Sequence, residues 1–223
     1  KYSLSSRRTR NVDNMRKQKQ KYPELTKKII EDSDIILEIL DARFIEETRN
    51  KEVEEILAKQ KKKVIYVINK SDLIGKETRP DIYPCVFVSC VLRKGVRELR
   101  DLIKRQAKTI QKNEEKDKVN VGIIGYPNTG KSSLINLLIG KNSAKTAAEA
   151  GFTKGLQKLR LSPGIVLIDS PGIIPFGENE FDLFLIESKN PNQLKDVEGV
   201  AVKLIQTMGK EKGIEEIVSC AGR

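Results

Sequence analysis

The stretch GYPNTGKS at residues 125–132 decides the fold. It reads G-x-x-x-x-G-K-S, the pattern of a loop that holds a phosphate group. The apolar residues 119–124 before it predict a buried strand, and residues 133–139 after it predict a helix that ends near Gly140. Glycine at both ends of the loop lets backbone N–H groups turn inward, and the start of the helix adds its dipole. The sequence therefore predicts a phosphate site between a strand and a helix.

The side chains of this loop are expected to have different roles in binding a nucleotide. Lys131 is placed to reach the β- and γ-phosphates, which also makes it a candidate catalytic residue, and the Ser132 hydroxyl is placed to bind Mg²⁺. The residues predicted to contact the nucleotide here are Asn128, Thr129, Gly130, Lys131, Ser132 and Ser133. A glycine-rich turn between two core elements is the alternative interpretation.

The composition excludes several kinds of site. The chain of 223 residues contains no histidine, so a histidine base, a histidine triad and a histidine-ligated zinc are all excluded. Its three cysteines lack metal-ligand spacing, which argues against a disulfide framework and fits a reducing cytoplasm. No apolar run reaches the length of a membrane span, and the first residues do not resemble a signal peptide. We therefore expect a soluble cytoplasmic monomer with no membrane contact.

The net charge of +11 is concentrated at the start of the chain. Residues 1–28 hold ten basic and two acidic residues, which leaves +8 in this segment. Such an asymmetry favours a polyanionic partner. Because residues 1–20 have few apolar positions to bury, we predict that they form a basic arm. A solvated arm that only aids solubility is the alternative.

The hydrophobic pattern alternates between strands and helices. This alternation predicts an α/β fold with a mainly parallel six-stranded sheet and helices on both faces. The turn Pro163-Gly164 supplies one antiparallel pair. The expected strands are 34–41, 64–68, 86–88, 119–124, one around Leu159 and Leu161, and 165–168; the expected helices are 22–33, 46–60, one ending near 111, and 133–139.

Three further motifs follow predicted strands, where α/β folds bind their ligands. Asp169 and Gly172 belong to a D-x-x-G motif, in which the aspartate holds Mg²⁺ through water and the Gly172 N–H meets the γ-phosphate as a candidate catalytic group. Each motif alone also fits a polar turn that closes a strand. In combination with the phosphate loop they favour a GTPase.

The other two motifs are expected to recognise the base. Residues 69–72 read N-K-S-D and contribute Asn69, Lys70 and Asp72 to the predicted site. The Asp72 carboxylate can accept hydrogen bonds from guanine N1–H and N2–H₂, a pair of donors that adenine lacks, so an ATPase conflicts with this residue. Ser89 and Cys90 are predicted to offer backbone N–H groups to guanine O6.

The order of these motifs resembles that of one family. N-K-S-D and S-C come first, and GYPNTGKS, G-F-T at 151–153 and D-S-P-G at 169–172 follow, whereas Ras-like GTPases begin with the phosphate loop. The chain is similar in this respect to the circularly permuted GTPases of the YlqF/YawG family, which are implicated in ribosome assembly. The similarity covers roughly residues 13–175 and includes Asp41-Ala42-Arg43, which is like the family's D-A-R-x-P stretch.

The resemblance implies further roles. It makes Thr153 the switch threonine, a metal ligand and catalytic residue, and it connects Asn128 with potassium dependence. The chain also departs from the pattern: Ile45 replaces a proline, Cys90 replaces an alanine, and Asn14-Met15 stand where His-Met is common. Ile173 stands where Ras-like enzymes orient water with glutamine, so slow hydrolysis is expected.

The expected function is a GTP-hydrolysing switch in ribosome assembly that binds GTP or GDP, Mg²⁺ and K⁺, with ribosomal RNA or a ribosomal subunit as partner. The alternative is a nucleotide-gated RNA- or protein-binding module with negligible turnover. The predicted division is a basic arm at 1–20, a circularly permuted GTPase domain at 21–178 with a mobile loop at 140–156, and a short C-terminal helical segment at 179–223. In that last segment Val200, Val202, Leu204 and Ile205 are core candidates.

Overall fold

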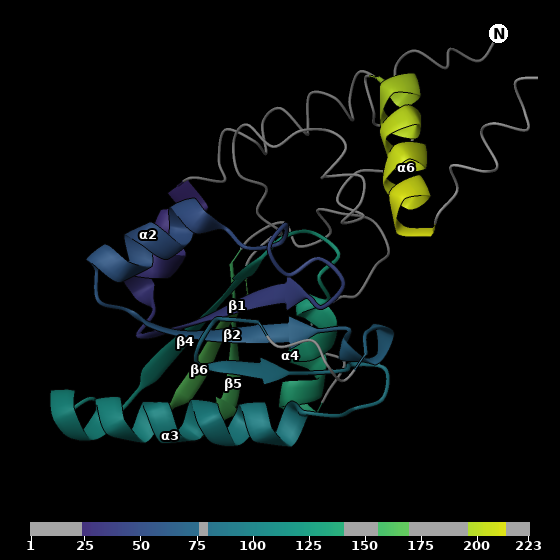
Figure 1. Ribbon diagram of the computed structural model, residues 1–223. Coiled ribbons are helices and arrows are strands. Elements are labelled where there is room, and N and C mark those ends of the chain that lie inside the picture. Colours follow the sequence, from purple (N-terminus) through teal and green to yellow (C-terminus); the bar gives the residue numbers. More distant parts are fainter. Residues whose placement is uncertain (1–23, 76–79, 141–155, 170–195, 213–223) are drawn as a thin grey trace, which may run out of the picture. The chain divides into compact units, whose positions relative to one another are not determined.

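The computed structural model describes residues 24–75, 80–140, 156–169 and 196–212, with side chains up to 205 (Figure 1). The predicted basic arm, most of the predicted mobile loop and residues 170–195 lie outside the described residues. Thr153, Gly172 and Ile173 therefore lie outside them as well. None of the described helices is both long and apolar enough to cross a bilayer.

A six-stranded sheet with the order β3-β2-β1-β4-β6-β5 forms the centre of the fold. All neighbours pair in parallel except β5 and β6, which are antiparallel and joined by the predicted Pro163-Gly164 turn. The strands are β1 (Ile35–Asp41), β2 (Lys63–Asn69), β3 (Cys85–Phe87), β4 (Val119–Gly125), β5 (Gln157–Ser162) and β6 (Ile165–Asp169). The predicted strand count and direction are confirmed.

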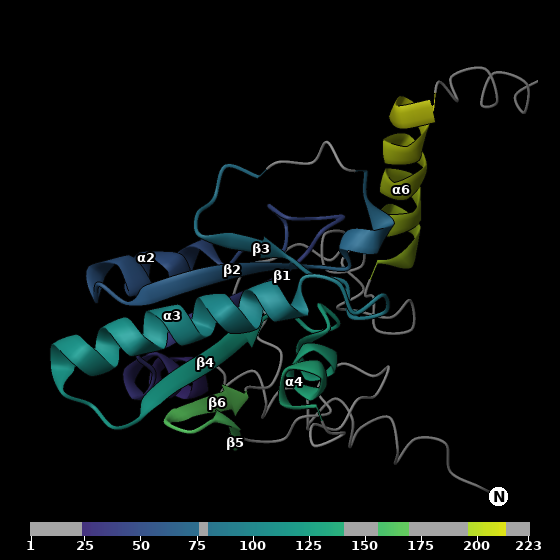
Figure 2. The same ribbon diagram turned by 90° about the horizontal axis from the view of Figure 1, so that it is seen from below.

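Helices cover both faces of this sheet, as predicted (Figures 1 and 2). On one face α3 (Val96–Glu114) and α4 (Lys131–Ile139) bury Leu99, Ile103 and Leu134 against the odd-numbered positions of β1. On the other face the helix at residues 24–32 and α2 (Lys51–Lys59) pack against Ile36 and Ile124. This division follows from the alternation of side chains along a strand that is buried on both sides.

Helix α2 begins five residues later than the predicted start at 46. Residues 42–48 instead form turns, in which the Thr48 hydroxyl donates to the Phe44 carbonyl at 2.6 Å and accepts from the Asp41 N–H at 3.1 Å. Asn50 then caps the helix, because its side chain accepts from the Val53 N–H at 3.1 Å. The predicted amphipathic helix is present but shorter, since Thr48 uses its polar group to close the preceding turn.

Helix α3 runs three residues further than predicted, to Glu114. Its Arg100 side chain donates to the carbonyls of Leu137 and Leu138, at 3.2 and 2.6 Å, at the end of α4. The carboxyl end of a helix exposes unpaired carbonyls with a partial negative charge, so this arginine ties the two helices together.

The chain divides into two compact units, Lys1–Ile173 and Ile174–Arg223. The second unit contains α6 (Val197–Lys212), which agrees with the expected helical pattern. Val200 is buried, but Val202 and Ile205 are 54% and 58% exposed, so their prediction as core residues is wrong. The boundaries at 20 and 178 stay predictions.

Candidate nucleotide-binding site

The predicted motifs meet at one edge of the sheet because their strands run in parallel. In the register of the sheet, Asp41 of β1 lies beside Asn69 of β2, Ile39 lies beside Gly125 of β4, and Ile123 lies beside Asp169 of β6. The carboxyl ends of four neighbouring strands therefore carry the base motif, the phosphate loop and the candidate metal ligand. This edge is the usual ligand position in an open α/β sheet.

The phosphate loop closes around the Lys131 ammonium group. Lys131 is 7% exposed, and its Nζ donates to the carbonyls of Gly125 at 2.9 Å and Tyr126 at 2.6 Å. Burial lowers the pKa of Lys131 to about 8, and the carboxylate of Asp169 opposes that shift. Two neutral carbonyls do not balance the charge of this buried cation. A phosphate group bound beside it would therefore form a strong charge-assisted hydrogen bond with Lys131.

Asn69 links the base motif to the phosphate loop. Its buried side chain donates from Nδ2 to the Thr129 carbonyl at 2.8 Å, across sixty positions of sequence. Thr129 is in turn fixed by its hydroxyl, which donates to the Tyr126 carbonyl at 2.9 Å. Gly130 has a φ of +90°, and a Cβ there would collide with the Asn69 amide. Glycine is therefore required at 130 by the contact as well as by the backbone.

Asp72 and Ser89 are brought together as the sequence predicts, but Ser89 acts differently from the prediction. Asp72 lies exposed in a 3₁₀ turn, η1 (Ser71–Leu73), and accepts a hydrogen bond of 2.5 Å from the Ser89 hydroxyl. The Ser89 N–H donates to the Lys94 carbonyl at 3.1 Å, so it is not available to a guanine oxygen. The serine instead orients the carboxylate that is predicted to recognise the base.

Cys90 keeps its predicted position beside the same site. Its N–H makes no hydrogen bond to any residue that the structure describes, which leaves this donor for guanine O6. Burial raises the pKa of the Cys90 thiol to about 11, so the thiol stays neutral and unreactive at physiological pH. The thiol packs against the core and interacts with the Asn69 side chain, which partly offsets the effect of burial on its pKa.

Asp41 joins the site through Lys70, a contact that the sequence interpretation did not foresee. The Lys70 Nζ lies 2.8 Å from Asp41 Oδ2, and the Arg43 guanidinium donates to both carboxylate oxygens at 2.8 and 3.1 Å. Burial alone would raise the pKa of Asp41, but hydrogen bonds from Arg43 and Lys70 hold it below its usual value. The D-A-R stretch is like a family motif in the sequence, but its role depends on the register of β1 and β2, which no local pattern reveals.

Ser132 and Asp169 are the described residues that could hold Mg²⁺. Asp169 is 1% exposed and close enough to Lys131 to affect its charge, while Ser132 opens α4 beside that lysine. Among the described residues there is no cluster of three or more acidic, cysteine or histidine side chains suited to a metal. One carboxylate and one hydroxyl fit Mg²⁺ only if nucleotide oxygens and water complete its shell, as they usually do for this ion.

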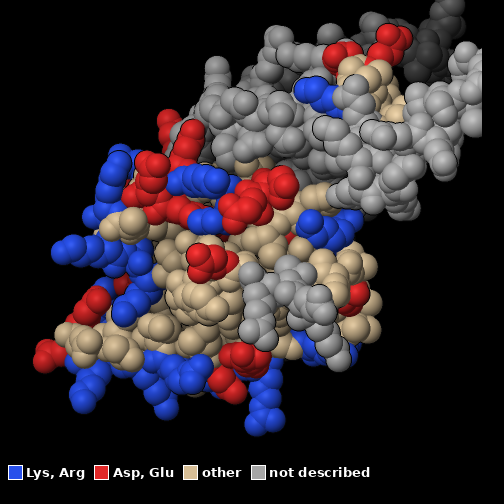
Figure 3. All heavy atoms as spheres, in the orientation of Figure 1, with Lys and Arg blue, Asp and Glu red and all other residues tan. Residues whose placement is uncertain are grey.

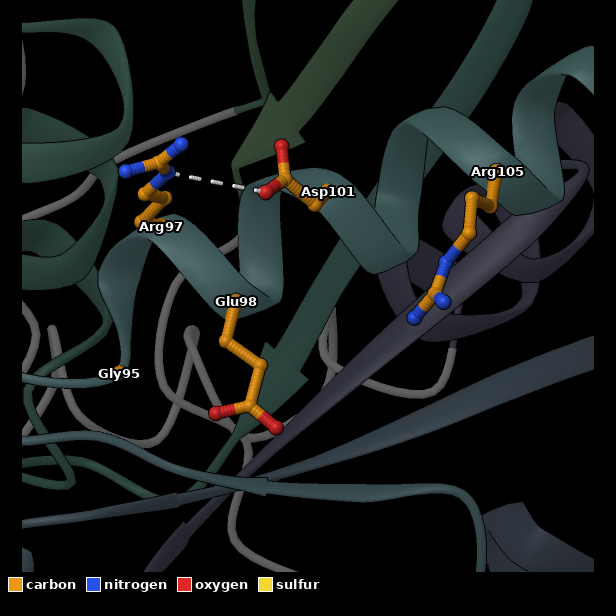
Figure 4. Close-up of a pocket in the computed structure, with 5 residues that line it drawn as sticks. All are labelled: Gly95, Arg97, Glu98, Asp101 and Arg105. Carbon is orange, nitrogen blue, oxygen red and sulfur yellow. Dashed lines mark ion pairs between the residues drawn. The ribbon is translucent and has the colours of Figure 1, made fainter.

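A separate hollow of about 530 Å³ lies on α3, outside the nucleotide residues (Figure 4). It is lined by Gly95, Arg97, Glu98, Asp101 and Arg105, with a distance of 4.0 Å between Arg97 and Asp101. It contains none of the residues predicted to bind the nucleotide.

Proteins with names that refer to GTP are similar to this chain. A family model described as 50S ribosome-binding GTPase matches residues 120–219. The uncharacterized GTP-binding protein MJ1464 of Methanocaldococcus jannaschii is 44% identical over 171 residues, which are 74% of this chain and 45% of that protein. Nuclear GTP-binding protein NUG1 of Saccharomyces cerevisiae is 31% identical, over 91% of this chain and 45% of that protein. The chain thus spans less than half the length of these relatives.

The fold also matches a solved structure. GNP-bound YlqF from T. maritima superposes with a TM-score of 0.61 at 23% identity, covering 87% of this chain and 77% of that one. The order of the motifs, the sheet and these relatives agree with one another. The chain belongs to the circularly permuted GTPases of the YlqF/YawG family.

Proposed function

We propose that this chain binds GTP and GDP with Mg²⁺ at the carboxyl edge of the sheet and hydrolyses GTP as a switch in ribosome assembly. The observation that carries the proposal is the hydrogen bond between Asn69 and Thr129, because it joins the base motif and the phosphate loop into one site. A base pocket and a phosphate loop at a fixed separation are what a guanine nucleotide requires.

The chemistry assigns a role to each group. Lys131 and the start of α4 bind the phosphates, Ser132 and Asp169 hold Mg²⁺, and Asp72 accepts the guanine donors. Mg²⁺, when bound, neutralises charge on the β- and γ-phosphate oxygens. Thr153 and Gly172 belong to the proposed γ-phosphate contacts on sequence grounds only. Asn128 adds a proposed dependence on K⁺.

Ribosomal RNA or a ribosomal subunit is the proposed partner. The matching family is described as 50S ribosome-binding, and relatives are named as nuclear or nucleolar GTP-binding proteins. The net charge of +11 suits an RNA-rich particle. A monomer that works in the cytoplasm remains part of the proposal.

A nucleotide-gated binding module with negligible turnover is the second candidate. It is favoured by Ile173, which cannot orient water as glutamine does, and by the lack of any histidine in the chain.

Turnover of GTP measured with and without ribosomal subunits distinguishes the two candidates. We expect slow hydrolysis alone, faster hydrolysis with subunits, and faster hydrolysis in K⁺ than in Na⁺. Lys131→Ala is the control and should bind no GTP, because the loop loses its cation. Tight GTP binding without turnover in any of these conditions would establish the binding module instead.

A further inference from the structure

The outward face of α3 carries a row of basic side chains. Leu99, Ile103, Ala107 and Ile110 are the buried positions of this helix. At 100° per residue the opposite side holds four exposed cations, which are Lys104, Arg105, Lys108 and Lys112. We call these four residues the α3 basic face; Figure 3 shows basic side chains along this lower edge of the molecule.

The α3 basic face differs from the ends of its helix in how its charge is balanced. None of the four cations forms an ion pair or a hydrogen bond through its side chain with a residue that the structure describes. Their neighbours at the ends of the helix do: Arg97 lies 4.0 Å from Asp101, and Lys116 contacts Asp34 and Glu114 at 2.7 and 2.6 Å. The α3 basic face is thus the part of this helix whose charge is not balanced by the described residues of the protein.

This arrangement works against the helix itself. Lys104, Lys108 and Lys112 follow one another at intervals of four, so like charges lie side by side on successive turns. From Arg93 to Lys112 the chain holds eight basic and two acidic residues. Such a surface is relieved by an external polyanion, which removes the repulsion and releases counterions.

The surface chemistry favours RNA over a protein partner. None of the large exposed apolar side chains of the described residues lies on α3. Protein interfaces are depleted of lysine and rich in aromatic anchors, whereas nucleic-acid interfaces are polar and strongly positive. We propose that the α3 basic face binds the phosphate backbone of structured ribosomal RNA, an inference that rests on the ribosomal partner proposed above.

The position of this face allows RNA and nucleotide to bind together. Helix α3 follows β3 and precedes β4, so it runs from the carboxyl edge of the sheet to the amino edge (Figure 2). Its carboxyl half, which carries the basic face, therefore lies at the amino edge of the sheet, away from Lys131 and Asp72. RNA contact here should leave the affinity for GTP unchanged.

The test measures binding of deproteinised large-subunit ribosomal RNA across a salt series, with GTP affinity measured in parallel. The variant is Lys104→Gln, Arg105→Gln, Lys108→Gln and Lys112→Gln together. The matched control removes the same charge from the helices on the other face of the sheet and from the turn after α2, and is Lys28→Gln, Lys51→Gln, Lys59→Gln and Lys61→Gln.

We expect the control to resemble the wild type, and the α3 variant to bind RNA at least tenfold more weakly at about 0.1 M salt. Its log–log salt slope should be smaller by roughly 0.7–0.9 for each phosphate that the variant no longer neutralises. Equal slopes in both variants would overturn the inference while GTP binding stands. If the wild type does not bind naked RNA but the α3 variant binds ribosomal subunits more weakly than the wild type does, the inference would be overturned in favour of an acidic protein as the partner. RNA binding without any GTP binding would instead refute the proposed function and leave this face assigned.

Discussion

At the scale of single residues, Asp72 is the group on which base choice should depend. Its carboxylate is oriented by the Ser89 hydroxyl at 2.5 Å and otherwise faces solvent, where guanine could offer two donors. Ser89 therefore matters through its side-chain hydroxyl, whereas the sequence predicted a role for its backbone N–H.

Asp72→Asn should weaken GTP binding and favour xanthosine triphosphate, because xanthine presents a carbonyl where guanine has its amino group. An unsatisfied buried polar group costs about 1–3 kcal/mol, so the preference should change by about tenfold or more. Titration of both nucleotides measures it. Ser89→Ala is the control, with weaker binding of GTP and no gain for the xanthine nucleotide. Unchanged selectivity in Asp72→Asn would disprove the guanine pocket.

A second residue-scale prediction concerns Asp41. Asp41→Asn removes the ion pair of 2.8 Å between Lys70 and Asp41, so both GTP and GDP should bind more weakly, by a similar factor of about ten, since charge-assisted hydrogen bonds are worth about 1.5–3 kcal/mol. Calorimetry with each nucleotide is the measurement. Asp41→Glu should recover part of the affinity if the negative charge is what matters, because it keeps the charge on a side chain that is one methylene longer. A loss confined to GTP would show that Asp41 acts on the γ-phosphate and not on Lys70.

At the scale of elements, strand β1 contains a buried carboxyl group whose hydrogen bonding is incomplete. Glu38 is fully buried on the face covered by α2; one oxygen accepts from the Asn50 N–H at 2.9 Å, and Oε2 has no hydrogen-bond partner among the described residues. Burial raises the pKa of Glu38 from 4.5 to about 8. The carboxyl group is therefore protonated in the folded protein at neutral pH.

This raised pKa makes stability depend on pH in a defined direction. Between pH 4.5 and 8 the folded state holds a proton at Glu38 that the unfolded state has lost, so stability falls as pH rises. Glu38→Gln lacks this loss, and its advantage over the wild type should grow by roughly 1 kcal/mol per pH unit across that window. Urea unfolding at pH 5 and pH 8 measures the difference. A difference that stays constant with pH would place the titration elsewhere.

The sequence predicted elements well where a period or motif is local. The parallel strands and the phosphate loop follow from residues within a few positions of one another. The start of α2 was missed because Thr48 bonds to Asp41, seven positions earlier, and the role of Asp41 was missed because it depends on register. Contacts between distant segments are set by the tertiary fold, so they leave no periodic signal in the chain.

At the scale of the whole molecule, two basic segments are proposed to contact RNA, the predicted arm at 1–20 and the α3 basic face. Removal of residues 1–20 should weaken RNA binding and reduce the salt slope while GTP affinity is kept, because no nucleotide motif lies there. Filter retention across a salt series measures this. If the arm and the α3 basic face contact separate phosphates, combining the deletion with the α3 variant should reduce the slope by the sum of the two effects.

The central pairing of β1 with β4 has a consequence for biosynthesis. Strand β1 ends at Asp41, but the partner on its second edge ends at Gly125, so this edge cannot close until those residues are made. At about 5–20 residues per second, the delay is roughly 4–17 s. Throughout that time the nascent chain exposes an unpaired strand edge beside Ile35 and Leu37, which is where aggregation can begin. The phosphate loop is synthesised only at the end of this interval, so nucleotide cannot protect the earlier half, and a chaperone at the ribosome exit would have to do so.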